Sequence, residues 1–380
     1  MKIPLCKPYI NQKEIDSVKK VLQSGWLAHG PKSEQFETLF KNYIGKKYAA
    51  SFNSCTSALL TAMLSLKLRG EVILPSFTFV ASANTIVLAG CRPVFADINP
   101  NTFNIDPKDI ERKITKKTVA IMPVHYAGQI CEMDKIMRIA KKYKLAIIED
   151  SAETIGAELN KKKAGSFGIG CFSFYPTKNI TTGEGGMLTF NDDSILPKVN
   201  VIKSHGLTKP TFKRMNEIKS WYRDAILPGY NFRMSDINAA IGVEQIKKIE
   251  KINYLRRKNA QYLNDKLERF IGSKISVPRV DNIKKHVYQM YVIKIKDTSK
   301  RDALLNHLRR KGIDASVHFD PPVHLQTYYR KKYAPRKLPV TEKVCKQVIT
   351  LPMFPSLKKK ELDYIIKNII IFFRHERKYS

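Results

Sequence analysis

Two residues placed at the ends of apolar stretches point to one kind of chemistry. Within the segment 171–186, Lys178 lies just past an apolar stretch, inside a polar and glycine-rich turn. Asp150 ends another apolar segment, residues 145–149. A lysine amine can form a Schiff base with an aldehyde cofactor, and an aspartate on a neighbouring strand can hold a pyridinium nitrogen. Together the two residues indicate pyridoxal phosphate (PLP) chemistry.

A second polar segment, Asn53–Ser57, stands between a predicted strand and a predicted helix. The start of a helix offers unpaired backbone N–H groups and the positive end of the helix dipole, so it binds phosphate well. The alternative is that the Ser and Thr residues only cap the helix. Cys55 is small enough to allow the backbone to approach a phosphate group closely.

The elements that must position these residues alternate between strand and helix patterns. Such alternation predicts an α/β fold, with a mainly parallel sheet covered by helices on both faces. In the first helix, Ile15, Val18 and Leu22 are expected on one face. Strands are expected at 48–52, 71–74, 93–96, 119–124, 146–149 and 171–174, and helices at 12–23, 33–43, 58–66, 82–89, 107–113 and 133–142.

The last third of the chain predicts a smaller α+β unit. A long amphipathic helix is expected over 235–270, with Val243, Ile246 and Ile249 near one face. After it we expect a strand at 287–295, a helix at 300–310, a strand at 315–317 and a terminal helix.

Composition bounds the class of protein. The chain has 380 residues, of which 43% are hydrophobic, so it can bury one large core and a smaller one. No stretch approaches the roughly 20 apolar residues of a membrane helix, and no secretory signal pattern opens the chain. The six cysteines are scattered without a Cys-x-x-Cys pair, which favours reduced thiols in a cytoplasmic protein over disulfides or a metal site.

The net charge of +33 is the unusual feature of the composition. Such a field attracts polyanions and anionic small molecules, including nucleotide-sugars. The alternative is a general enrichment of lysine on solvated helix faces. The charges are spread along the chain and no nucleic-acid motif accompanies them, so we expect no specific nucleic acid partner.

Five further motifs carry a resemblance to a known family: Pro75–Phe79, Glu149–Glu153, Ser173–Asn179, Gly183–Gly186 and Gly229–Asp236. With matches in family order from Pro4 to Pro355, the sequence resembles the DegT/DnrJ/EryC1/StrS family of PLP-dependent sugar aminotransferases. The resemblance implies the PLP-dependent transferase fold of type I, with a large PLP-binding domain over 1–250 and a small domain over 251–380.

The resemblance also implies roles for cofactor-binding residues. Lys178 would be the catalytic residue, first holding the cofactor and then moving a proton. Asp150 would face the ring nitrogen, Phe79 would stack on the ring, and Glu153 would lie near the phenolic oxygen. Phosphate contacts are implied for Thr56, Ser57 and Ser173, and for Asn231 from the neighbouring subunit of a homodimer.

The substrate side of the resemblance is carried by four residues. Trp26 belongs to an early loop that borders the entrance, and Glu184 lies in the lysine's turn. His318 and His324 match a histidine-containing run in which Phe319 replaces the family's tyrosine. Each also has an ordinary structural alternative: interface packing for Trp26, a turn hydrogen bond for Glu184, and a buried structural role for the histidines.

The implied activity is the transfer of an amino group from glutamate to a nucleotide-linked keto-deoxysugar, at C4 or C3, in amino-sugar or polysaccharide biosynthesis. PLP and pyridoxamine phosphate (PMP) are the implied cofactor forms, with no metal and no membrane partner. One alternative is a cofactor-dependent sugar dehydratase, but relatives with that activity carry histidine in place of Lys178. The other is a non-catalytic member of the fold that binds polyanions.

Overall fold

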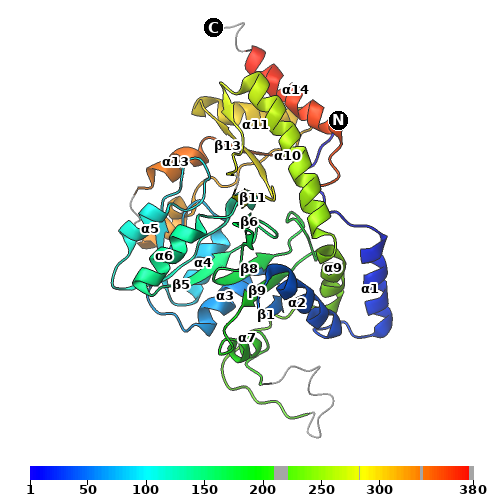
Figure 1. Ribbon diagram of the computed structural model, residues 1–380, viewed down its shortest axis with the longest axis vertical. Coiled ribbons are helices and arrows are strands. Elements are labelled where there is room, and N and C mark those ends of the chain that lie inside the picture. The colour runs from blue at the N-terminus through cyan, green and yellow to red at the C-terminus, as the bar shows by residue number, and fades with distance from the viewer. Residues whose placement is uncertain (209–220, 282, 334–336, 376–380) are drawn as a thin grey trace.

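A seven-stranded sheet forms the centre of the molecule (Figure 1). The structure, a computed structural model, describes residues 1–208, 221–281, 283–333 and 337–375. The strands are β1 (Tyr48–Phe52), β2 (Glu71–Pro75), β3 (Arg92–Ala96), β4 (Thr118–Ile121), β5 (Ala146–Asp150), β8 (Ile169–Ser173) and β9 (Gly186–Phe190). Their order is β1-β9-β8-β5-β4-β2-β3, and within the sheet β9 alone opposes the direction of the rest.

Helices cover both faces of this sheet. They are α1 (Gln12–Ser24), α2 (Pro31–Ile44), α3 (Cys55–Ser65), α4 (Val80–Leu88), α5 (Pro107–Lys113), α6 (Met133–Tyr143), α7 (Leu196–Ile202) and α9 (Asp236–Ile246). Successive side chains of a strand point to opposite faces of the sheet. In β8, Cys171 packs with α3 and α4 on one face, whereas Phe172 packs with α2 and α9 on the other. The predicted α/β architecture, covered on both faces, is confirmed.

The C-terminal part builds a second core. A three-stranded antiparallel sheet of β10 (Ile275–Ser276), β12 (Tyr291–Ile295) and β13 (Val348–Leu351) packs with α10 (Ile249–Ile271), α11 (Arg301–Arg310) and α14 (Lys359–His375). In Figure 1, α10 runs from α9 along the side of the molecule to α14. Ile3, from the other end of the chain, is buried in the same core. The division at residue 250 stays a prediction.

Smaller elements connect these two cores. β6 (Glu158–Leu159), β7 (Lys162–Lys163) and β11 (Lys284–Lys285) form a third sheet. The remaining elements are α12 (Thr327–Tyr333), α13 (Pro339–Cys345) and the 3-10 turns η1 (Tyr126–Gly128), η2 (Thr298–Lys300) and η3 (Val323–Leu325). Among the described residues, no helix is both long and apolar enough to cross a membrane.

Three local predictions differ from the structure. The helix expected over 235–270 is two helices, since Lys248 N–H donates to the Gln245 carbonyl three residues back and tightens the turn between α9 and α10. The strand expected at 315–317 is a single bridge from Ser316 to Thr350. The face of α1 is also inverted: Ile15 and Leu22 are 55% and 54% exposed.

Polar contacts explain the inverted face of α1. Glu14 is buried because its carboxylate accepts from Asn11 N–H and from the Gln245 side chain of α9. The side chain of Asn11 in turn accepts from Lys13 N–H, so the capping box and the helix-to-helix bond share Glu14. These bonds turn the polar side of α1 inward.

A single carboxylate joins the starts of α2 and α9. Asp236, buried at the first turn of α9, accepts from Gly30 N–H, Lys32 N–H and Ser33 N–H, each at 2.9 Å, and from the Ser33 hydroxyl at 2.7 Å. These are the N–H groups that the start of a helix leaves unpaired. Asp236 therefore caps α2 from about 200 residues away along the chain.

Replacing Asp236 by alanine is expected to lower the free energy of unfolding by about 2–3 kcal/mol, because the buried donors at the start of α2 lose their acceptor. Urea denaturation followed by circular dichroism measures the change. Asp236→Asn keeps one acceptor oxygen and is expected to lose less. An unchanged denaturation midpoint in the alanine variant would contradict this role.

Candidate active site

A cavity of about 640 Å³ opens where the carboxyl ends of β5 and β8 meet the C-terminal core. Its walls come from the starts of α3 and α4, the ends of β5 and β8, and the glycine-rich turn. The C-terminal core supplies the opposite wall, through Gln289, Met290, His318, Phe319, Thr350, Leu351 and Met353. Carboxyl ends of parallel strands are a common place for a ligand in α/β sheets.

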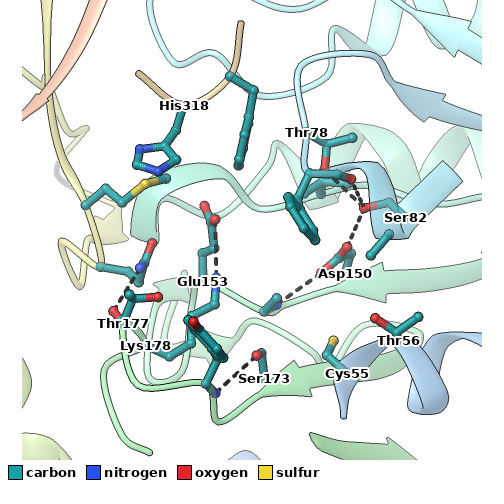
Figure 2. Close-up of a pocket in the computed structure, with 18 of the residues that line it drawn as sticks. Cys55, Thr56, Thr78, Ser82, Asp150, Glu153, Ser173, Thr177, Lys178 and His318 are labelled. Carbon is teal, nitrogen blue, oxygen red and sulfur yellow. Dashed lines mark hydrogen bonds and ion pairs between the residues drawn. The ribbon is translucent and has the colours of Figure 1, made fainter. Parts of the chain in front are cut away.

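Asp150 lies at the end of β5, beside Cys171 of β8. Its Oδ2 accepts from the Ser82 hydroxyl at 2.7 Å, and its Oδ1 accepts from Ala152 N–H at 3.2 Å. Burial raises the pKa of the Asp150 carboxyl, while the two hydrogen bonds act in the opposite direction. Figure 2 shows Ser82, on the first turn of α4, directed at the Asp150 carboxylate. Ser82 therefore favours the ionised form.

Replacing Ser82 by alanine is expected to weaken PLP binding about ten-fold at acidic pH, with little change in alkaline buffer. The variant removes a hydrogen bond to the carboxylate, so the already raised pKa of Asp150 rises further. If Asp150 faces the ring nitrogen as predicted, its protonated form cannot pair with the cationic ring. PLP affinity then falls as pH falls through the pKa of Asp150, and in the variant this fall starts at higher pH. PLP titrations from pH 5 to pH 8 measure it, with Ser82→Thr as the hydroxyl-bearing control. Superimposable profiles for the alanine variant and the unsubstituted protein would refute the effect.

Lys178 sits in a turn that is fixed by its neighbours. Its backbone N–H donates to the Tyr175 carbonyl, and the adjacent Asn179 side chain binds Asn253 of α10 and the Val287 carbonyl. Lys178 Nζ lies 3.4 Å from Glu153 Oε1. The second oxygen of Glu153 accepts from the backbone of η1 at 2.8 Å. The amine is therefore held inside the cavity by a carboxylate that is itself anchored (Figure 2).

The start of α3 faces the same cavity through Cys55 and Thr56. The first N–H groups of a helix have no acceptor within that helix. The glycine-rich turn packs tightly on this start: a Cβ at Gly186 would lie 2.3 Å from the Ser54 carbonyl oxygen. Glycine at this position thus lets β9 approach the loop in which a phosphate group would bind.

Eight of the twelve predicted site residues line this cavity, from Thr56 near the start of α3 to His318 in the C-terminal core. Phe79 is 61% exposed in the single chain. His318 binds Thr350 Oγ1 at 2.9 Å, and burial lowers its pKa, which favours the neutral ring. The eight are Thr56, Phe79, Asp150, Glu153, Ser173, Lys178, Glu184 and His318.

The other four lie outside the cavity of the single chain. His324 is 1% exposed, with ring nitrogens at 2.6 Å from Ser76 Oγ and 3.3 Å from Glu342, the buried structural arrangement that was its alternative. The Ser57 hydroxyl donates to Asn53, on the capping side of α3.

Trp26 and Asn231 are the remaining two. Trp26 donates its indole N–H to the His29 carbonyl. Asn231 is exposed, and its side chain accepts from Arg233. Neither residue reaches the cavity from its own chain.

Among the cavity residues that were not singled out from the sequence, Ser82 and Gln289 carry side-chain hydrogen bonds at the site. Ser82 lies in an apolar run, where a serine is easily taken as part of a helix. Gln289 stands inside the apolar run 287–293. A lone amide in a strand-like apolar run was the signal that could have identified Gln289.

The residues present fit PLP. An amine, a buried carboxylate and the start of a helix face one cavity, in the combination that an aldehyde, a ring nitrogen and a phosphate group require. Lys178, Asp150 and the start of α3 come from different segments of the chain, and the fold brings them to one place.

A model of the DegT/DnrJ/EryC1/StrS aminotransferase family matches residues 8–370. The chain belongs to this family. The spore coat polysaccharide biosynthesis protein SpsC of Bacillus subtilis strain 168 is 36% identical to it over 379 residues, covering 97% of this chain and 96% of SpsC.

Solved structures agree with this membership. Helicobacter pylori PseC, an aminotransferase involved in the biosynthesis of pseudoaminic acid, is similar with a TM-score of 0.92 and 29% identity, covering 99% of this chain and 100% of PseC. NtdA of Bacillus subtilis with bound cofactor PMP is similar with a TM-score of 0.86 and 31% identity, covering 96% of this chain and 82% of NtdA. The family and its structural neighbours are PLP-dependent sugar aminotransferases, which confirms the predicted family, fold, cofactor and type of enzyme.

Proposed function

We propose that this chain transfers the amino group of glutamate to the ketone of a nucleotide-linked keto-deoxysugar, at C4 or C3. The observation that carries the proposal is the placement of Lys178, Glu153 and Asp150 on one cavity. The relatives support the sugar: SpsC belongs to spore coat polysaccharide biosynthesis, and PseC to pseudoaminic acid biosynthesis.

The residues divide the work by their chemistry. Lys178 would bind the cofactor covalently through Nζ, and the start of α3, with Thr56 and Ser173, would bind its phosphate. When bound, the cofactor accepts the electron pair of the broken carbon–hydrogen bond and carries the amino group between the two substrates. The freed Lys178 amine takes the proton from the amino-bearing carbon of glutamate and returns one to the sugar carbon. Glu153, 3.4 Å from Nζ, holds this amine in the cavity between those transfers.

Asp150 would stabilise positive charge on the ring nitrogen as an ionised carboxylate. The Ser82 and Ala152 hydrogen bonds favour that ionised form against the effect of burial. Glutamate leaves as 2-oxoglutarate, and the keto-sugar leaves as an amino-sugar, so atoms balance over the two half-reactions.

The visible spectrum of the purified protein with PLP tests the first half-reaction. A yellow absorbance band that bleaches on addition of glutamate would support the proposal, and nucleotide-linked keto-sugars added next should restore the band. A band whose absorbance does not change when glutamate is added would point to another amino donor or to the dehydratase alternative. The absence of any band would favour the polyanion-binding alternative.

We further propose a homodimer with shared sites. Phe79 and Leu88, at the two ends of α4, are 61% and 66% exposed in the single chain. Contact with a second subunit would remove this apolar surface from water. Asn231 does not reach the cavity of its own chain, and in a dimer the Asn231 of one subunit would contact the phosphate in the other.

Mixing two defective variants tests the shared site. Asn231→Asp places a negative charge beside the phosphate and is expected to weaken PLP binding, while Lys178→Ala lacks the amine. In a mixed dimer, one site combines Lys178 of the Asn231→Asp subunit with Asn231 of the Lys178→Ala subunit, so both residues at that site are intact. The other site contains both substitutions. Re-associated mixtures are therefore expected to recover roughly a quarter of the original activity at limiting PLP. A mixture no more active than its separate components would contradict sharing.

A further inference from the structure

The wall of the cavity contributed by the C-terminal core holds a hydrogen-bond acceptor without a partner. Gln289 lines the cavity and is only 5% exposed. Its Nε2 donates to the Thr177 carbonyl at 3.0 Å. Because a carbonyl only accepts, this contact fixes which end of the amide is nitrogen. Gln289 Oε1 is buried and has no hydrogen-bond partner among the described residues.

The position of Gln289 is fixed from behind. Arg256, a buried residue of α10, donates through Nη1 to the carbonyls of Tyr288, Gln289 and Met353 at 2.9–3.2 Å. The side chain is fixed in turn by Thr177, the residue that precedes Lys178. Gln289 Oε1 is therefore a rigid acceptor beside the lysine's turn, and a buried acceptor left unpaired costs stability unless a ligand satisfies it.

The chemistry of this acceptor discriminates between the two proposed substrates. At neutral pH the carboxylates of glutamate only accept hydrogen bonds, and its amino group is engaged in the reaction. A sugar ring carries hydroxyl groups, which donate. Lys178 is the only lysine or arginine among the described residues that line this cavity, and its amine is already paired with Glu153.

We propose that Gln289 Oε1 accepts a hydrogen bond from a hydroxyl group of the sugar, which makes Gln289 a determinant of sugar binding. The inference rests on the proposed function and adds to it a residue that distinguishes the two half-reactions. Gln289 acts on the sugar that accepts the amino group, and the glutamate half-reaction proceeds without it.

Two variants separate the functions of the amide. Gln289→Met has nearly the same shape and lacks both the acceptor and the donor. Gln289→Glu keeps an acceptor oxygen and loses the N–H that binds Thr177. Calorimetric titration of the PMP-loaded proteins uses dTDP-glucose and UDP-N-acetylglucosamine as probes, and the glutamate half-reaction is followed by the visible absorbance of the PLP-loaded proteins.

The methionine variant is expected to bind the better probe about five-fold more weakly, the usual effect of one lost hydrogen bond, with its glutamate half-reaction changed by less than two-fold. The glutamate variant is expected to bind that probe more tightly than the methionine variant. Equal probe binding by the methionine variant and the unsubstituted protein would overturn the proposed role of Gln289 and would leave the proposed function intact. Equal slowing of the glutamate half-reaction in both variants would overturn it in favour of a purely structural contact to Thr177.

The unsubstituted protein separates this inference from the proposed function. If it bleaches with glutamate but binds neither probe, the sugar part of the proposed function fails and the role of Gln289 falls with it. If it neither bleaches nor binds, the proposed aminotransfer itself is refuted.

Discussion

Replacing Lys178 by alanine is expected to reduce turnover by at least about 10³-fold, because under the proposed mechanism the variant loses both the covalent attachment and the base that moves the proton. The fold should survive, since the amine's one polar contact within the described chain is with Glu153, and Glu153 keeps its bond to the backbone of η1. Turnover, the visible absorbance band and the thermal unfolding midpoint are measured on the same preparation.

A matched control is Lys141→Ala, which removes an exposed lysine of α6. It should retain full activity and the yellow band. Small primary amines in the buffer should partly restore proton transfer in the Lys178 variant. Near-normal turnover in Lys178→Ala would refute the mechanism, whatever its stability.

Replacing Asp150 by asparagine is expected to slow the glutamate half-reaction by roughly 10²-fold or more at saturating PLP, the scale on which a lost electrostatic partner acts. Asparagine has nearly the same volume and can still pair with Ser82 and Ala152, so the surrounding contacts persist. It lacks the negative charge that, as we propose, keeps the ring nitrogen protonated. Single-turnover absorbance measurements report the rate.

The control for Asp150→Asn is Asp150→Glu, which restores the charge at a displaced position and should recover part of the rate. Circular dichroism and PLP titration separate a chemical defect from a folding or binding defect. A wild-type rate in the asparagine variant at saturating cofactor would exclude a role for the carboxylate in the chemistry.

The sequence predicted the chemistry of the site better than its surroundings. Lys178 and Asp150 could be found because each follows an apolar strand, and adjacent parallel strands bring such ends together. The order of the strands was not predictable, because an apolar segment does not specify its neighbour. β9 was missed altogether, because its first residue, Gly186, belongs to the glycine-rich turn and hides where the strand begins.

Long-range polar contacts were the other limit. Counting apolar residues placed Ile15 and Leu22 on the buried face of α1, but Glu14 is drawn inward by Gln245, more than 200 residues later. Ser82 and Gln289 are similar cases, since each acquires a role only through a partner in a distant segment. Local patterns carry no information on such partners.

The antiparallel β9 has a consequence for folding of the chain during its synthesis on the ribosome. β1 has only β9 as a neighbour in the central sheet, with Tyr48 opposite Phe190 and Phe52 opposite Gly186. β1 leads into the start of α3, where we propose that the phosphate binds. β1 can therefore pair only after more than a hundred further residues have been synthesised. Pairing over such sequence separations is slow and leaves strand edges open. We expect nascent chains that end before residue 186 to be the form of this protein that depends most on chaperones.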